Sequence, residues 1–101
     1  MASRKPADIE GALLRKGFVL DDSKDHRYLY LWVNGRRTSV RTKVSHARAD
    51  YGDGLLGMVQ RQLRLTGDKR VFNGLLDCPV TAEEYVAHLL RRGEISLGDA
   101  R

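Results

Sequence analysis

The sequence has little cysteine and no long hydrophobic run. Cys78 is the single cysteine among 101 residues, so no disulfide can form within the chain, which suits a reducing compartment. No stretch approaches the ~18 consecutive apolar residues of a membrane-spanning helix. No signal peptide precedes the first predicted helix. We therefore expect a globular, cytoplasmic protein.

The usual motifs of metal, cofactor and nucleophile sites are also missing. The sequence has no CxxC, HxxxH or EF-hand spacing, no glycine-rich phosphate loop and no nucleophile motif around a serine or cysteine. We therefore predict neither a metal nor a cofactor. His88 falls outside the apolar stripe of its helix and is expected to be exposed. His26 remains as the candidate acid–base group, because histidine titrates near neutral pH.

Acidic residues are absent from the centre of a basic chain. The net charge is +5, the pI is about 9.7, and no Asp or Glu lies between Asp25 and Asp50. Six basic residues lie in that interval: Arg27, Arg36, Arg37, Arg41, Lys43 and Arg48. Such a cluster is typical of nucleic-acid binding. A solvated basic face that maintains solubility is the alternative, and charge alone does not distinguish nucleic acid from a membrane surface or an acidic protein.

The same interval has the alternating pattern of two strands. From His26 to Val33 one face would carry His26, Tyr28, Tyr30 and Trp32, and the other Arg27, Leu29, Leu31 and Val33. Asn34-Gly35 predicts a type I′ hairpin turn. On the return strand, Arg37, Ser39, Arg41 and Lys43 alternate with Thr38, Val40 and Thr42. We expect the leucine face to cover a core and the aromatic face to stay open; a sheet buried on both faces is the alternative.

Helical patterns flank the strands. Residues 6–16 predict a helix that begins at Pro6, buries Leu14 among others and ends at Gly17, with a short strand over 18–20. A second helix is expected after a cap at Asp53, with Leu55 in its apolar stripe and its end at Gly67. A short helix near residues 71–76 would be broken at Asn73-Gly74. Thr81 and Glu84 predict a capping box that opens a last helix.

This order of elements predicts an α+β fold. Two helices would cover one face of a three-stranded antiparallel sheet, in the α-β-β-β-α layout of double-stranded-RNA-binding-type domains. Residues 1–67 would form that core. Residues 68–101 would be a helical C-terminal extension packed on the same domain.

Over roughly Pro6 to Leu65, the chain resembles the HicA-type toxins of toxin–antitoxin systems. The resemblance rests on short motifs: Gly17-Phe18 after the first helix, His26 opening the second strand, Gly35-Arg36-Arg37 at the hairpin turn, His46 in the next loop and Gly54-Leu55-Leu56 at the second helix. The family's small residue pair before the histidine is replaced by Lys24-Asp25.

The resemblance implies a metal-independent mRNA endoribonuclease with His26 as its catalytic acid or base, and a cognate antitoxin as protein partner. RNA supplies the 2′-hydroxyl as nucleophile, so such a site needs proton transfer and cations for the phosphate. The RNA-binding residues would be Arg27, Tyr28, Tyr30, Trp32, Arg36, Arg37, Arg41, Lys43, His46 and Arg48. A non-catalytic RNA-binding module and a protein-interaction or dimerisation domain remain as alternatives.

Overall fold

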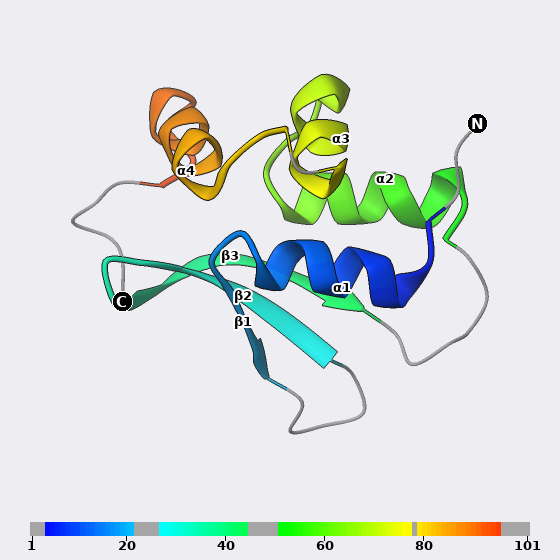
Figure 1. The fold of residues 1–101 in the computed structure, drawn as a ribbon. Helices are drawn as coiled ribbons and strands as arrows, with labels where there is room; N and C mark the ends of the chain where they lie inside the picture. Colours follow the sequence, from blue (N-terminus) through cyan, green and yellow to red (C-terminus); the bar gives the residue numbers. More distant parts are fainter. Residues whose placement is uncertain (1–3, 22–26, 45–50, 78, 96–101) are drawn as a thin grey trace.

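The structure is a computed structural model that describes residues 4–21, 27–44, 51–77 and 79–95. An N-terminal helix precedes a three-stranded antiparallel sheet, and three helices follow it (Figure 1). The elements are α1 (Pro6–Leu14), β1 (Phe18–Asp21), β2 (Arg27–Val33), β3 (Arg36–Val44), α2 (Asp53–Gln62), α3 (Lys69–Asp77) and α4 (Ala82–Arg91). The predicted α+β class and the order of helix, three strands and helix are confirmed.

The sheet follows the alternation of the sequence. Its order is β1-β2-β3, and Leu29 and Leu31 of β2 are completely buried. Asn34 and Gly35 both have positive φ, 55° and 78°, as a type I′ turn requires. On the second strand of the hairpin, Thr38, Val40 and Thr42 share one face, as predicted, and the structure shows that this face is buried.

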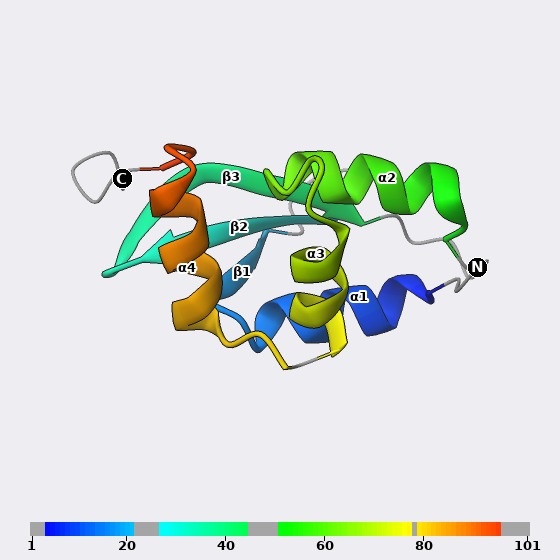
Figure 2. The same ribbon diagram turned by 90° about the horizontal axis from the view of Figure 1, so that it is seen from above.

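In the described part of the chain, the helices α1 to α4 lie on the same side of this sheet (Figures 1 and 2). Helix α1 contacts all three strands, α2 lies along β3, and α3 packs against α1. The other sheet face carries no helix, so the alternative of a sheet covered by elements on both faces is wrong for the described part of the chain.

Helix α1 begins at Pro6 as predicted but ends at Leu14, two residues before the predicted end at residue 16. Pro6 stands at its first turn, and Gly17 has φ of 94° in the turn that leads to β1. The predicted burial of Leu14 is wrong, because 43% of its surface is exposed while the preceding Leu13 is fully buried. Lys16 is buried, and its Nζ donates a hydrogen bond to the carbonyl oxygen of Val80.

Helix α2 differs from its prediction at both ends. Gly52 occupies the N-cap position and Asp53 is the first helical residue, so Asp53 does not cap the helix. Leu55 is 46% exposed, which corrects its expected place in the buried stripe. The helix stops at Gln62, before Gly67, because the chain turns at Arg64, which has a left-handed φ of 64°.

Helices α3 and α4 share the hydrophobic core of the sheet. Phe72, Leu75, Tyr85 and Leu89 belong to the same buried cluster as Leu29. The Tyr85 ring stacks on Phe18, with centroids 6.0 Å apart, and its hydroxyl donates to the Leu63 carbonyl. Burial raises the pKa of Tyr85, so the group stays protonated. The C-terminal helices therefore complete the core over the sheet.

Two predictions concern the ends and interior of these last helices. The capping box is confirmed: Glu84 N donates to Thr81 Oγ1, and Thr81 N donates to Glu84 Oε1. The predicted break at Asn73-Gly74 is wrong, because α3 continues through both residues. Every helix in the described ranges is too short or too polar to cross a lipid bilayer.

Candidate nucleic-acid interface

The helix-free side of the sheet, called the open face below, combines aromatic and basic side chains. Strand β2 contributes the aromatic residues and β3 contributes most of the polar ones, while β1 adds one apolar and one acidic residue. Its members are Val19, Asp21, Tyr28, Tyr30, Trp32, Arg37, Ser39, Arg41 and Lys43. Tyr28 and Tyr30 are half-buried, whereas Trp32 is 40% exposed. These side chains form a surface that an incoming ligand can reach.

Arginines and tyrosines pair across the two long strands. Tyr30 stands opposite Arg41 in the register, and Tyr28 stands opposite Lys43. The Arg37 guanidinium lies 4.8 Å from the centroid of the Tyr30 ring, and that of Arg41 lies 5.3 Å from the Tyr28 ring. Both distances are within the range of cation–π attraction. The two tyrosine rings are themselves 6.2 Å apart, so the four side chains form one contiguous group.

A hydrogen bond further orders this group. Arg41 Nη1 donates to the Tyr30 hydroxyl over 3.4 Å, and this contact raises the pKa of Arg41. Because the guanidinium has five donor hydrogens, four remain for a ligand such as a phosphate. Arg41 can thus contact an aromatic residue and an anion at the same time.

An irregularity in β3 places Arg37 next to Tyr30. Tyr30 pairs with Arg41, and Trp32 pairs with Arg37. Between these two pairs β2 advances by two residues and β3 by four, so β3 contains two extra residues. The extra residues are held by Thr38, whose Oγ1 donates to Leu31 O over 2.9 Å and accepts from Val40 N over 3.1 Å. Such bulges increase the local twist of a strand. Because Arg37 pairs with Trp32, it is the diagonal neighbour of Tyr30, and its guanidinium lies over the Tyr30 ring.

Charge is distributed unevenly across the open face. The strand order places the basic β3 residues on one side, the aromatic β2 residues in the middle and Val19 with Asp21 on the other side. Asp21 is the only acidic residue of the open face among the residues described. An anionic polymer is therefore attracted to the β3 side, and planar groups attached to it can reach the β2 rings.

Two predicted RNA-binding residues lie away from the open face. Arg27 is on the α1 side, where its Nε and Nη2 each donate over 2.8 Å to the two carboxylate oxygens of Glu10. This part-buried ion pair ties β2 to α1. Arg36 is exposed at the hairpin turn and pairs with Val33, whose side chain faces the helices.

Three further predicted site residues, His26, His46 and Arg48, lie outside the described residues. In the sequence, His26 immediately precedes Arg27, the first residue of β2. The predicted roles of all three stay predictions.

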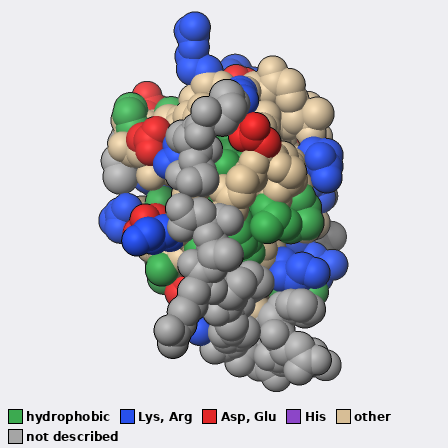
Figure 3. Space-filling model, turned by 90° about the vertical axis from the view of Figure 1, so that its right-hand side faces the viewer, with side chains coloured by type: hydrophobic (Ala, Val, Ile, Leu, Met, Phe, Trp, Pro, Cys, Tyr) green, Lys and Arg blue, Asp and Glu red, His purple; other side chains and the backbone are tan. Residues whose placement is uncertain are grey.

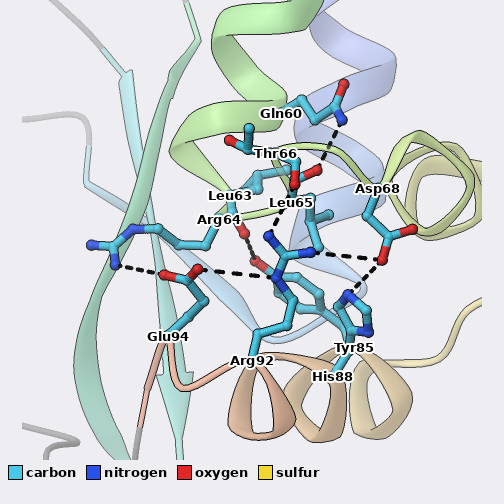
Figure 4. A network of polar contacts seen from close by, with 10 residues as sticks. All are labelled: Gln60, Leu63, Arg64, Leu65, Thr66, Asp68, Tyr85, His88, Arg92 and Glu94. Carbon is cyan, nitrogen blue, oxygen red and sulfur yellow. Dashed lines mark hydrogen bonds and ion pairs between the residues drawn. The ribbon is translucent and has the colours of Figure 1, made fainter.

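His88, expected to be exposed, is largely buried in a polar network between α4 and the chain that follows α2 (Figure 4). Its Nε2 lies 2.8 Å from Asp68 Oδ2, in an approach that is not aligned as a hydrogen bond. The contact is therefore an ion pair only when the imidazole is protonated. Arg92 also approaches Asp68 and donates to the Thr66 carbonyl over 2.9 Å. This network joins α4 to the rest of the fold.

Other surfaces offer weaker candidates for a site. In the parts of the chain that the structure describes, no three His, Cys, Asp or Glu side chains group together as ligands for a metal. Figure 3 shows the end of the molecule where α1 and α2 begin, with Lys and Arg side chains on both flanks of that view. The basic character thus extends beyond the open face, which is distinguished by its aromatic rings.

Comparisons with models of known protein families, with curated proteins and with solved structures found no match. The resemblance to HicA-type toxins consequently rests on the short sequence motifs alone.

Proposed function

We propose that this protein binds single-stranded RNA on the open face. The observation that carries the proposal is the contiguous group of Tyr28, Tyr30, Arg37 and Arg41 on an uncovered sheet. Aromatic rings on an open sheet stack on unpaired bases, and each stacked base contributes ~1–3 kcal/mol. The adjacent arginines bind phosphates through paired donors. Bases would lie over β2 and the phosphate backbone along β3.

Binding should depend steeply on salt, because phosphate contacts release counterions. We expect the double variant Arg37→Gln/Arg41→Gln to bind a labelled oligouridine much more weakly than the wild type. The slope of log K against log salt should become shallower by about 1.4, since each lost contact to a single strand contributes ~0.7. Fluorescence anisotropy over a salt series measures both quantities.

A matched control removes the same charge elsewhere. Arg70 of α3 and Arg91 of α4 are exposed and lie on the helical side of the molecule. The variant Arg70→Gln/Arg91→Gln should keep most of the affinity and slope. Equal losses in the two double variants would show that net charge alone drives binding, and would overturn the assignment of the open face.

We also propose, from the resemblance to HicA-type toxins, that the bound RNA is cleaved with His26 as general acid or base. In such a reaction the 2′-hydroxyl loses its proton and attacks the adjacent phosphorus, and the 5′-oxygen leaves with a proton. Arginines beside the phosphate would stabilise the charge that develops on its oxygens. From the same resemblance, we propose that an antitoxin protein binds this protein and covers its basic surface.

Cleavage is tested with purified protein and a mixed mRNA in the presence of EDTA. The wild type should cleave, and His26→Ala should not, while both retain the same circular dichroism spectrum and RNA affinity. Cleavage by both proteins would contradict the role of His26. Binding without cleavage by the wild type would leave a non-catalytic RNA-binding module, and a stable dimer without RNA affinity would indicate an interaction domain.

A further inference from the structure

A polar pocket of about 310 Å³ opens where β3 meets the end of α2. It is called the β3–α2 pocket here. Tyr28, Ser39, Arg41 and Lys43 line it from the sheet, and Gln62 and Arg64 line it from the end of α2. Its volume is at the small end of ligand pockets, which suits a compact polar group.

Three cations converge on this pocket from two parts of the chain. Arg41 and Lys43 belong to β3, whereas Arg64 follows α2 and extends its side chain toward the sheet (Figure 4). Gln62 Oε1 accepts from Thr42 Oγ1 over 2.6 Å and from Lys43 N over 3.2 Å. With that oxygen engaged, the amide nitrogen is the group that Gln62 offers a ligand. Cations and donors surrounding a small volume favour an anion with several oxygens.

The backbone of Arg64 is unusual for such a residue. Its φ of 64° lies in the left-handed region that glycine occupies without a steric penalty. The turn geometry does not require a long side chain there, since a left-handed φ favours glycine. An outlier of this kind points to a function of the side chain. The function that the geometry offers is to carry a guanidinium into the β3–α2 pocket.

Glu94 holds Arg64 in place from the C-terminal segment. Its Oε1 accepts from Arg64 Nη1 over 3.5 Å, and its Oε2 lies 4.0 Å from Arg92 Nε (Figure 4). A single long contact occupies one of the five donor hydrogens of the guanidinium. The remaining donors can bind an anion without breaking the ion pair, although the carboxylate also repels that anion.

We propose that the β3–α2 pocket binds one backbone phosphate of the RNA strand that crosses the open face, an inference that rests on the proposed function. Tyr28, Ser39, Arg41 and Lys43 belong to both the pocket and the open face. A phosphate in the pocket would thus be adjacent to a base on the Tyr28 ring. Arg64 would anchor the strand on the β3 side and fix where it leaves the sheet.

The test uses Arg64→Gly, which removes the cation and relieves the backbone. The variant should unfold at the same temperature as the wild type or a higher one, because glycine adopts this φ without a penalty. It should nevertheless bind a labelled oligouridine about tenfold more weakly, as expected for the loss of a charge-assisted contact, with the salt slope shallower by ~0.7. Arg64→Lys, which keeps the charge, should retain most of the slope.

Two further measurements identify the phosphate as the ligand. Replacing the backbone phosphates of the oligomer with uncharged methylphosphonates should abolish the difference between Arg64→Gly and the wild type. Glu94→Gln should bind the normal oligomer more tightly, because a repelling carboxylate is removed. A persistent difference with the uncharged oligomer would overturn the phosphate assignment.

The outcomes separate this inference from the proposed function. If Arg64→Gly binds like the wild type while Arg37→Gln/Arg41→Gln is weakened, the pocket does not hold a phosphate and the open face still binds RNA. If the wild type fails to bind the oligomer at low salt, both proposals fail. A loss in Arg64→Gly that equals the loss in Arg70→Gln would reflect net charge only and would also overturn the pocket.

Discussion

At the scale of the residue, Gly74 shows how a close contact restricts which amino acid a position can hold. A Cβ atom at this position would lie 2.6 Å from Val80 Cγ2. Val80 cannot easily move aside, because its backbone N donates to the Gly74 carbonyl over 3.1 Å and its side chain is β-branched. The sequence suggested a helix break at Gly74. The contact that requires the glycine comes from the following loop, which local periodicity does not describe.

We expect Gly74→Ala to destabilise the protein by up to about 2 kcal/mol, since overpacking costs ~1–3 kcal/mol and the gain in helix propensity offsets ~1 kcal/mol of it. Gly57 of α2 provides the control, because a Cβ there would meet only Arg61 Nη1, at 3.8 Å. Gly57→Ala should be neutral or stabilising by up to ~1 kcal/mol. Urea unfolding of both variants measures the difference. A stabilising Gly74→Ala would show that Val80 moves freely.

At the scale of the element, α4 is defined by its first turn. Thr81 and Glu84 satisfy each other's backbone N–H groups, and the helix then buries Tyr85 and Leu89. The capping box was readable from the sequence because all its atoms lie within one turn. The cap at Asp53 was misplaced by one residue, since Gly52 and Asp53 are both common at helix starts.

Thr81→Ala should lower the free energy of unfolding by ~1 kcal/mol, because the N–H of Glu84 loses its acceptor. Thr81→Ser keeps the hydroxyl oxygen and should unfold close to the wild type. Thermal unfolding followed by circular dichroism compares the three proteins. An unchanged midpoint for Thr81→Ala would mean that water replaces the cap without cost.

The burial of neighbouring leucines marks the limit of helical periodicity. Leu13 is buried and Leu14 exposed in α1, and Leu56 is buried and Leu55 exposed in α2. Adjacent helical positions differ by about 100° around the axis. The periodicity therefore indicates that one of two neighbouring leucines faces the core, but it does not decide which one. The angle at which each helix crosses the sheet decides which leucine faces inward. By contrast, strand alternation has two outcomes only, and the faces of β2 and β3 were predicted correctly.

At the scale of the whole molecule, one hydrophobic cluster joins the sheet to all four helices. The aromatic and basic composition of the open face followed from the sequence, because both depend on strand alternation. Two parts of the site did not follow. Arg27 is diverted to Glu10 on α1, and Arg64 reaches β3 from the end of α2. Both depend on contacts between segments far apart in the chain.

We predict that the protein unfolds in one cooperative transition. Trp32, the single tryptophan, reports on β2, whereas far-UV circular dichroism is dominated by the helices. The two signals should give the same urea midpoint, because α3 and α4 complete the core over the sheet. An earlier loss of helical signal would show that residues 68–101 form a separately unfolding unit.

The hydrogen bond between Lys43 N and the side-chain oxygen of Gln62 affects whether the protein can aggregate through the edge of its sheet. Strand β3 is an edge strand of the sheet and is nine residues long. The unpaired backbone groups of a long edge strand can pair with a strand of another molecule. Here the Lys43 N–H already has an intramolecular acceptor in Gln62, the strand bulges beside Thr38, and arginines project from it. The opposite edge strand, β1, is only four residues long. These features of β3 and β1 disfavour polymerisation through the sheet edges, although one face of the sheet is uncovered.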